Sequence, residues 1–497
     1  MAITGLSTTV LELKVAFEQA KGERGTYENR WEDYAGWTIP HLYPDDNLAE
    51  GTEFQHDYQS LGAQAVNHLS NKIVMTLFAP ARPFFRLELT QDQKADLRGR
   101  GISSADIETL TGTVEKEAMR NMEKVRLRTS VITAVKHLIT LGNSLLYFPD
   151  KEGDALRNSQ VYSLRDYIVR RDLSGNVLQI ITRDRRVCRT LPEELRLQCE
   201  VKGHKEEDKI DLYTGITRRE DGKFFVKQEL GEVGIASTDF GIIPAADLPW
   251  IPLSWNLTRG EDYGVGLVEE FAGDFSVYSQ LSENVLNLAS LAADIKILVN
   301  PMGQTDVKTL NESESGTYVH GLETDISYLQ LEKLADFKFV QETMADYSRR
   351  IGSAFLLNTQ VTRDAERVTA EEIRLQANEL EASLGGVYSR LAEEMQQPLA
   401  RMLIGTVNSA LKDIEPTVLT GIESLSRNSE HEQMMLFLND LTIFNNVPDD
   451  MKSEIKLSDM AKILATNRGI EHDKFLKTDE EKAAEQEAAK EQAADAE

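Results

Sequence analysis

Cysteine is scarce in this sequence, which has only two in 497 residues. Cys188 and Cys199 have one histidine nearby, His204, so a tetrahedral zinc site would be one ligand short, and neither a zinc site nor a disulfide framework is indicated. We therefore expect reduced, structural thiols. The N-terminus carries acidic residues in an amphipathic pattern, which is not typical of a secretion signal.

Long apolar runs are also missing. The most apolar stretch, residues 285–297, is interrupted by Asn, Ser and Asp and is shorter than the roughly 20 residues that span a membrane. We expect no membrane partner and assembly in a cytoplasm. A chain of this length with 41% hydrophobic residues can bury a substantial core, so we expect more than one domain.

Basic residues are fewer than acidic ones. The sequence has 55 Lys and Arg and 82 Asp and Glu, which gives a formal net charge of -27. Such a field repels polyanions and disfavours tight wrapping of DNA around the chain. Transient passage of DNA remains compatible, since a conduit for a moving polyanion should not hold it through many phosphate contacts.

Common catalytic motifs are absent. There is no G-x-x-x-x-G-K-[ST] phosphate loop, no G-x-S-x-G elbow and no H-E-x-x-H pair. Residues 264–266 (Gly-Val-Gly) resemble half of a dinucleotide fingerprint, but Glu269 occupies the third glycine position. Neighbouring acids such as Glu371 and Glu372 point about 100° apart on a helix, so a solvated face is favoured over a nuclease metal site. We expect no catalytic residue, metal or cofactor.

Helical periodicity dominates residues 7–150. Val10, Leu13 and Phe17 share one face, and a second helix is predicted from apolar residues at 66, 69, 73 and 77. Pro80 and Pro83 close that helix. A later run over residues 110–141 drifts in phase, which predicts two consecutive helices with a stop at Gly142.

The pattern changes to β-rich runs between residues 160 and 252. One hairpin loop is expected at residues 173–176, and a clearer one at Asp221-Gly222, because Asp-Gly between strand-like runs favours a turn with positive φ. After Pro252 the order is helix, compact insert, helix, followed by a polar loop and a long helix over residues 367–410. Gly385-Gly386 in that helix predict either a kink or close packing of subunits, or a simple break between two helices.

The segment 362–399, TRDAERVTAEEIRLQANELEASLGGVYSRLAEEMQQPL, resembles the hallmark region of the head-to-tail connector (portal) proteins of short-tailed bacteriophages. Supporting matches are RWEDYA (30–35), SLGAQAVNHLSNKI (60–73), PARPFFRL (80–87), LGNSLLY (141–147), WNLTRGEDYGVG (255–266) and VNPMG (299–303). They cover most of the chain up to about Met402. Val265 departs from the family, which often has Arg after the Tyr-Gly of the GEDYG motif.

The resemblance implies an α+β portal fold, mainly helical with a β-rich subdomain and assembled as a ring. The expected regions are a wing (1–264, with the β-rich block at 160–252), stem helix 1 (265–291), a clip (292–332), stem helix 2 (333–355), a tunnel loop (356–366), a long wing helix (367–410), a crown (411–477) and an acidic tail (478–497). That tail has eight acids against two lysines and no apolar face.

The family's functional surfaces map onto three groups of residues. The tunnel loop, which projects into the DNA channel, would include Leu357, Gln360, Thr362, Arg363, Asp364 and Arg367. Channel-lining positions on stem helix 2 would be Lys333, Lys338, Arg349 and Arg350, although salt bridges to the next subunit are the stronger reading. Clip contacts would involve Asn300, Pro301, Gly303, Thr309 and Asn311.

Within the loop, Arg363 is a better candidate for weak phosphate contact than Arg367. The latter is placed to pair with Glu371 at i, i+4 on the following helix, and we favour that pairing over direct contact with DNA. Movement of the loop would act as a valve that retains packaged DNA.

The function implied is that of a portal subunit in a homo-oligomeric ring, a dodecamer by family resemblance, located at one vertex of the virion capsid. Its partners would be double-stranded DNA in the channel, a terminase, a tail adaptor, the major capsid and scaffold proteins, and internal core proteins. Two alternatives stay open: a capsid scaffold or minor structural protein, suggested by acidity and helix content, and a nuclease that uses Glu371 and Glu372.

Overall fold

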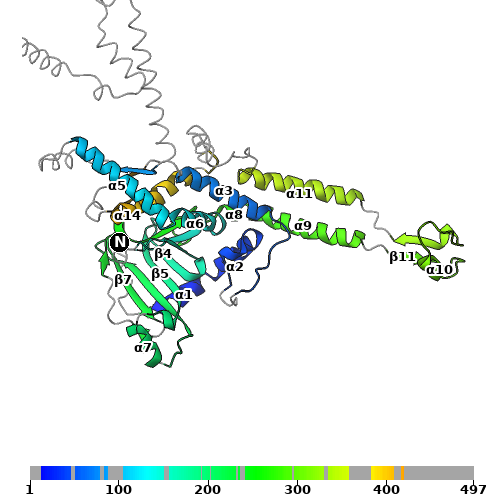
Figure 1. The fold of residues 1–497 in the computed structure, drawn as a ribbon, viewed down its shortest axis with the longest axis horizontal. Coiled ribbons are helices and arrows are strands. Elements are labelled where there is room, and N and C mark those ends of the chain that lie inside the picture. The colour runs from blue at the N-terminus through cyan, green and yellow to red at the C-terminus, as the bar shows by residue number, and fades with distance from the viewer. Residues whose placement is uncertain are drawn as a thin grey trace, which may run out of the picture. The chain divides into compact units, whose positions relative to one another are not determined.

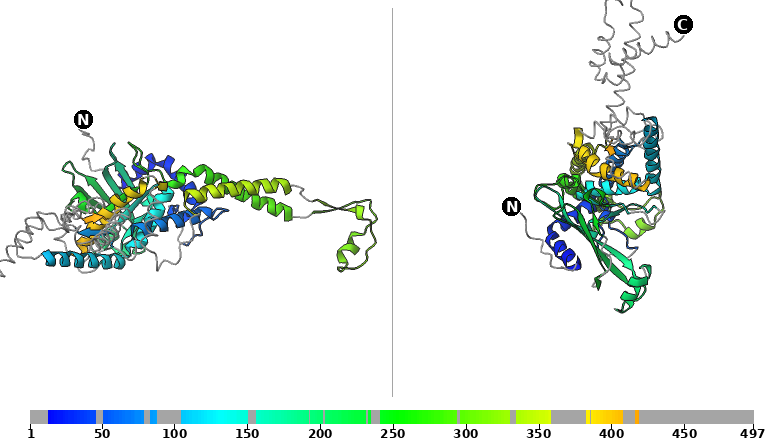
Figure 2. Two further views of the ribbon diagram at one scale, coloured as in Figure 1. Left: turned by 90° about the horizontal axis from the view of Figure 1, so that it is seen from above. Right: turned by 90° about the vertical axis from the view of Figure 1, so that its left-hand side faces the viewer.

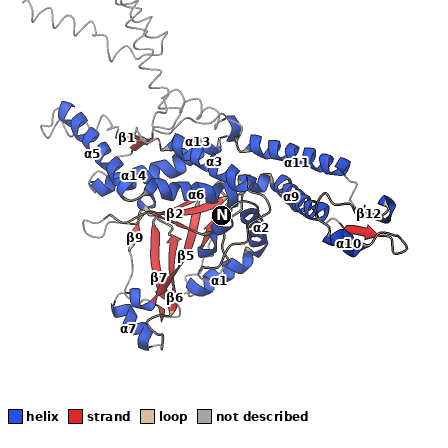
Figure 3. Cartoon of the chain, turned by 45° about the vertical axis from the view of Figure 1, so that its right-hand side comes forward, coloured by secondary structure: helices blue, strands red, loops and turns tan. Residues whose placement is uncertain are grey.

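The computed structural model describes residues 13–45, 51–78, 83–87, 104–149, 156–191, 193–201, 203–230, 233–234, 241–293, 296–329, 334–357, 382–384, 386–407 and 416–418. All of them belong to the first of two compact units, which comprises residues 1–367 and 379–418. Helices and strands both contribute to this unit (Figure 3), so the expected mixture of helix and sheet is confirmed.

The N-terminal part is helical, as predicted. Its helices are α1 (Leu13–Glu23), α2 (Gly25–Trp37), α3 (Leu61–Leu77), α5 (Ser104–Lys124) and α6 (Leu127–Leu141), with a 3-10 turn η1 (Pro40–Leu42). The repeating apolar residues of α3 form its buried face, namely Val66, Leu69, Ile73 and Leu77. The spacing in the sequence therefore identified the side of α3 that meets the core.

The predicted pair of consecutive helices is also confirmed. The chain leaves α5 and enters α6 through Arg126, which has a left-handed backbone with φ 53. Gly142 ends α6 in the same conformation, with φ 76, and its N–H donates to the carbonyl of Leu138 at 3.0 Å. A glycine at this position closes a helix without the steric cost that a side chain would add.

The β-rich block is a six-stranded sheet in the order β4-β5-β6-β7-β8, with β9 also paired to β7. The strands are β4 (Tyr167–Arg171), β5 (Val177–Val187), β6 (Lys209–Arg218), β7 (Phe224–Leu230), β8 (Val233–Gly234) and β9 (Ile242–Ile243). A three-stranded sheet joins β10 (Trp250–Ser254), β2 (Asn143–Tyr147) and β3 (Gln160–Tyr162) in that order. Short helices complete the block: η2 (Leu164–Asp166), η3 (Cys188–Thr190), α7 (Glu193–Val201) and η4 (Ala245–Asp247).

Both predicted hairpins are present. Between β4 and β5, the Asp172 carboxylate accepts the N–H groups of Ser174 and Asn176 at 2.8 Å, and Gly175 has φ 87. Between β6 and β7, Gly222 has φ 78, the positive value that the Asp-Gly turn predicts.

Three clusters of buried side chains hold the unit together. Helix α1 packs on the sheet, where the ring of Phe17 lies 5.5 Å from that of Tyr213. The largest cluster contains Trp31 and Trp255 and joins the helices to the three-stranded sheet. Cys188 and Cys199 lie in a third cluster and are buried and free, so the prediction of structural thiols is confirmed.

A pair of long helices leads to the insert. Helix α8 (Leu267–Glu270) precedes α9 (Ala272–Ala293), which runs beside α11 (Leu334–Ala354) (Figures 1 and 2). Between them, β11 (Lys296–Val299) pairs antiparallel with β12 (Ile326–Leu329), and the insert also holds α10 (Val307–Glu312) and η5 (Glu323–Asp325). A helix, insert, helix order was predicted.

The expected single helix over residues 265–291 is wrong in detail. Val265 is extended, and its N–H donates to the carbonyl of Asn256 at 2.8 Å. At Phe271 the backbone leaves the helical region, with φ -109 and ψ 19. This break lets α8 contact α6 while α9 pairs with α11, and helical periodicity does not report such a change of partner.

The expected continuous helix over residues 367–410 is interrupted. Gly386 has φ 86, and the chain continues as α13 (Val387–Leu391), a π-helical turn η7 (Ala392–Gln396) and α14 (Gln397–Val407). Of the two alternatives for the glycines, the structure has a break. β13 (Pro416–Val418) pairs with β1 (Phe85–Leu87), and the rest of residues 411–497 lies outside the described part of the chain.

Candidate functional site

The helix pair α9–α11 is anchored at its inner end by aromatic packing. The ring of Phe355 lies 5.6 Å from that of Phe275 and 6.2 Å from that of Phe271, each in an edge-on arrangement. Phe275, Ile351 and Phe355 have no exposed surface. Farther out, every described side chain in residues 276–290 and 338–350 is half-buried or exposed. The outer part of the pair thus has surface available to other chains.

Just after helix α11 ends, the first residue of the predicted tunnel loop has an unusual backbone conformation. Leu356 has φ 57, a left-handed conformation that a branched side chain rarely adopts. Its N–H donates to the carbonyl of Ser353 at 3.2 Å, and the N–H of Leu357 donates to that of Gly352 at 2.7 Å. These two bonds form a Schellman motif, which normally has glycine at the left-handed position. Burial of Leu356 offsets the backbone cost.

This motif fixes the direction in which the chain leaves α11. Leu357 is the one residue of the predicted loop set that the structure describes, and it is half-buried against the main core. The other predicted loop residues lie outside the described part of the chain: Gln360, Thr362, Arg363, Asp364 and Arg367. Their roles stay predictions.

The predicted basic residues of α11 are exposed. Arg349 forms an ion pair with Asp346 one turn earlier, and the guanidinium of Arg350 lies 4.9 Å from the centre of the Tyr347 ring. Lys338 is exposed nearer the insert, and Lys333 lies outside the described residues. An exposed i, i+3 ion pair contributes at most a few tenths of a kcal/mol, about 0.3. These side chains remain available for contacts with other molecules.

The insert is organised by a buried acid that sequence reasoning missed. Asp325 is 5% exposed, and its Oδ2 accepts the N–H groups of Gln304 and Thr305 at 2.8 and 3.2 Å and the hydroxyl of Thr305 at 3.0 Å. Its carbonyl accepts the N–H of Asn300 at 2.9 Å. At Gly303, an added Cβ would lie 2.4 Å from the Asp325 carboxyl carbon. A lone acid in a polar segment carries no periodic signal, so the sequence does not mark it.

The predicted clip contacts therefore divide into two kinds. Asn300 and Gly303 shape the turn that Asp325 holds, and the Thr309 hydroxyl donates to the capping Asp306 at 2.8 Å. Pro301 and Asn311 are exposed. Large apolar side chains are also exposed on this small insert, a mark of a contact surface. They are Ile297, Leu298, Met302, Val307, Leu310, Tyr318 and Leu322.

Two of the sequence motifs interlock where α6 meets β2. The side chain of Asn143 donates to the carbonyl of Gly264 at 2.9 Å and accepts its N–H at 2.8 Å. A Cβ on Gly142 would lie 2.2 Å from the Gly264 carbonyl oxygen, and one on Gly266 would lie 2.7 Å from the Gly142 nitrogen. The glycines at 264 and 266 therefore allow the backbone of residues 264–266 to pack closely against that of residue 142.

The RWEDYA motif (residues 30–35) meets the GEDYG motif around a buried arginine, Arg24. Arg24, 2% exposed, donates to the carbonyl of Tyr167 at 2.8 Å and pairs with Glu28 at 2.9 Å. Its guanidinium lies 5.7 Å from the centre of the Trp31 ring and 5.8 Å from that of Tyr263. The RWEDYA and GEDYG motifs thus meet around one cation. Their spacing in the sequence gave no indication of this contact.

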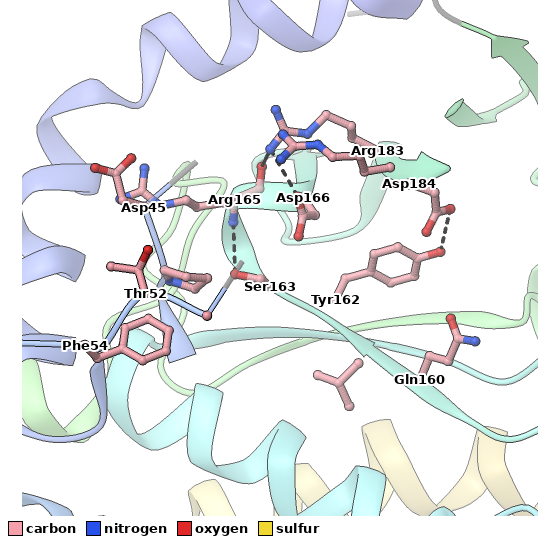
Figure 4. A pocket seen from close by; sticks show the side chains of 14 residues that line it. Asp45, Thr52, Phe54, Gln160, Tyr162, Ser163, Arg165, Asp166, Arg183 and Asp184 are labelled. Atoms are coloured by element: carbon pink, nitrogen blue, oxygen red, sulfur yellow. Dashed lines mark hydrogen bonds and ion pairs between the residues drawn. The ribbon is translucent and has the colours of Figure 1, made fainter. Parts of the chain in front are cut away.

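A cavity of 510 Å³ lies beside the sheet (Figure 4), and its lining holds three arginines and three aspartates. Arg165 pairs with Glu32, and Arg183 pairs with Asp166 at 3.1 Å. Burial raises the pKa of Asp184 above its usual range. With opposite charges balanced, the cavity has no excess of positive charge for a phosphate. No cluster of three or more His, Cys, Asp or Glu placed to hold a metal occurs within the ranges that the structure describes.

None of the described helices is long and apolar enough to cross a membrane. The described residues thus combine a structural core, a pair of exposed helices and an insert with an apolar surface.

Known proteins resemble this chain in sequence over most of its length. The chain is 34% identical to the portal protein of Escherichia phage T7, over 94% of this chain and 89% of that protein. It is also 34% identical to the portal protein of Enterobacteria phage SP6, over 94% of this chain and 90% of that protein. Among solved structures, the neck of an empty GTA particle covers 82% of this chain and 90% of its own, at 10% identity and a TM-score of 0.39, a likeness too distant to carry an argument.

The model of the family described as "Bacteriophage head to tail connecting protein" matches residues 11–476. This match covers nearly the whole chain and includes the segments that carried the resemblance in the sequence. The family's role is structural, so the nuclease alternative is set aside. The chain belongs to the bacteriophage head to tail connecting protein family.

Proposed function

We propose that this chain is the portal subunit of a short-tailed phage, one copy in a ring at a single capsid vertex through which DNA enters and leaves. The observation that carries the proposal is similarity along almost the full length to two portal proteins of short-tailed phages. A scaffold or minor structural protein would not be expected to match those proteins at both the β-rich block and the insert.

The region boundaries expected from the sequence are kept as part of the proposal. Residues 1–264 form the wing, α8–α9 and α11 the stem, residues 292–332 the clip and residues 356–366 the tunnel loop, with the long wing region, crown and acidic tail following. Support comes from the side-by-side helices α9 and α11, which bracket a compact insert.

The exposed apolar side chains of the insert favour a protein-binding role for the clip. In this proposal the clip binds a terminase during packaging and a tail adaptor afterwards, while the wing and crown meet the capsid, scaffold and internal core proteins. The ring is assembled in the host cytoplasm and remains in the virion. A dodecamer is the expected state.

The charge balance suits passage of DNA without adhesion. A net charge of -27 per copy disfavours binding of a polyanion, and local rings of Arg363 or of the α11 cations would permit weak phosphate contact. With no base-reading motif in the sequence, passage would be independent of DNA sequence. The polar loop after α11 would act as the valve against backflow.

Deletion of residues 357–364 tests the valve. We expect ring assembly to be spared, because the aromatic anchor of α9 and α11 lies outside the deletion, and retention of packaged DNA to fall. The measurement is the amount of nuclease-protected DNA in particles after packaging, compared with particles that carry an alanine substitution at Arg367. Normal retention in intact rings lacking the loop would rule out the valve.

A further inference from the structure

The two cysteines of the chain lie together in the connection between β5 and β6. Cys188 begins η3, immediately after β5, and Cys199 lies on α7, the helix at one end of the six-stranded sheet (Figure 1). Their side chains share one apolar cluster with Ile210 and Leu230 and are 2% and 1% exposed. Two residues that are separated in the sequence thus occupy the same small core.

A short turn holds the backbones of the two cysteines close to each other. The N–H of Cys188 donates to the carbonyl of Asp208 at 3.0 Å. The N–H of His204 donates to the carbonyl of Cys199 at 3.1 Å. Between these two anchors, the N–H of Lys205 donates to the Asp208 carboxylate at 2.8 Å, and the Asp208 N–H donates back to the Lys205 carbonyl at 3.0 Å. The cysteines are therefore attached to the two ends of one closed turn.

The thiols are themselves in contact. A hydrogen bond joins the side chains of Cys199 and Cys188. Burial, with a further contribution from Cys188, raises the pKa of the Cys199 thiol above its usual value. A thiol with a raised pKa carries little thiolate at neutral pH and reacts slowly. The pair is thus close enough to become bonded, and it stays reduced in a compartment that contains a thiol reductant.

We propose that Cys188 and Cys199 are a site of oxidation, at which a disulfide forms within each copy after the particle leaves the cell. This inference rests on the proposed function, because a virion protein is made in a reducing cytoplasm and released into an oxidising medium. The oxidant is a small-molecule disulfide of the oxidised glutathione class.

The reaction is a double thiol–disulfide exchange. The thiolate of one cysteine attacks a sulfur of the reagent, which forms a mixed disulfide and releases one reagent thiol. The thiolate of the other cysteine then attacks the protein sulfur of that mixed disulfide and releases the second reagent thiol. The two cysteines lose two protons and two electrons, and the reagent gains them as its two thiols.

The disulfide joins α7 to η3 and closes the loop of residues 188–199. Among the side chains of α7 that the structure describes, Cys199 is the buried one, whereas Leu197 and Val201 are 53% and 87% exposed. A short surface helix of this kind opens locally, and the opening gives a small reagent access to both thiols. Once formed, the covalent bond prevents α7 from leaving the cluster, because the closed loop has fewer open conformations.

Peptide mapping of the full-length wild-type protein tests the inference. The purified protein is incubated with oxidised glutathione, free thiols are alkylated, and trypsin cleaves after Arg189 and Arg196, so that the cysteines fall on different peptides. We expect these peptides to stay joined until a reductant is added, and the free thiols to fall from two per chain to none. The rate should rise about tenfold between pH 7 and pH 8, as the thiolate fraction does.

Cys188→Ser and Cys199→Ser are the matched controls. Each leaves one thiol, which can hold glutathione but cannot bridge the two peptides, so the peptides should separate without a reductant. In the wild type, thiols that remain free, mixed disulfides that persist, or disulfides that join two copies on a non-reducing gel would overturn the inference. None of these results bears on the proposed function, which is contradicted instead by the absence of rings in the same preparation.

Discussion

Replacement of Gly142 by alanine should destabilise the protein by more than about 3 kcal/mol. The new Cβ would lie 2.2 Å from the Gly264 carbonyl oxygen and 2.6 Å from the Gly266 nitrogen, on a backbone with φ 76. To relieve these contacts, the backbone at residue 142 must move away from residues 264–266. That movement breaks the two hydrogen bonds between the Asn143 side chain and the backbone of Gly264. The measurement is the midpoint of guanidinium unfolding.

Gly222→Ala is the matched control for that experiment. Gly222 has nearly the same backbone conformation, φ 78, but an added Cβ would meet nothing within 4 Å. Its cost should be about 1 kcal/mol, the ordinary penalty for a side chain at positive φ. Equal losses in the two variants would show that the close approach of residues 142 and 264 contributes nothing beyond backbone conformation.

Acid should destabilise the protein through His137. Burial, with a smaller contribution from His41, lowers the pKa of His137 to about 4, and its Nδ1 has no hydrogen-bond partner among the described residues. The unfolded chain, with a pKa near 6.5, therefore binds more protons between about pH 6.5 and pH 4. The free energy of unfolding should fall across this window by about 3 kcal/mol.

His137→Leu should remove this part of the acid sensitivity. The test compares the slope of unfolding free energy against pH for the wild type and the variant between pH 6.5 and pH 4, since carboxylates contribute equally to both. His204→Leu is the control, because that side chain is exposed, and it should leave the slope unchanged. A wild-type slope retained in His137→Leu would contradict the role of the buried imidazole.

Much of the fold could be predicted because its signals are local. The helical repeat of Val66, Leu69, Ile73 and Leu77 identified the buried face of α3, and Asp221-Gly222 located a hairpin from the conformation that glycine alone adopts easily. The stop at Gly142 followed from the same property. Each of these features depends on a few consecutive residues.

Other features depend on contacts between distant segments and left no local signal. The break at Phe271 arises because α8 and α9 pack against different helices, and Asp325 is buried only because the turn at residues 300–305 folds over it. Arg24 is another example, since its partners Tyr167 and Tyr263 are far along the chain. Among the site residues, the sequence singled out the basic side chains of α11 and the exposed Pro301 and Asn311 of the insert, whereas it did not mark the buried Asp325.

The most direct test of the central claim is electron microscopy of the purified full-length protein, with end-on views classified by rotational symmetry. The account predicts closed rings with an open axial channel and a fixed number of copies, expected to be a dodecamer. Compact particles with no ring, persisting as the protein concentration rises, would contradict it.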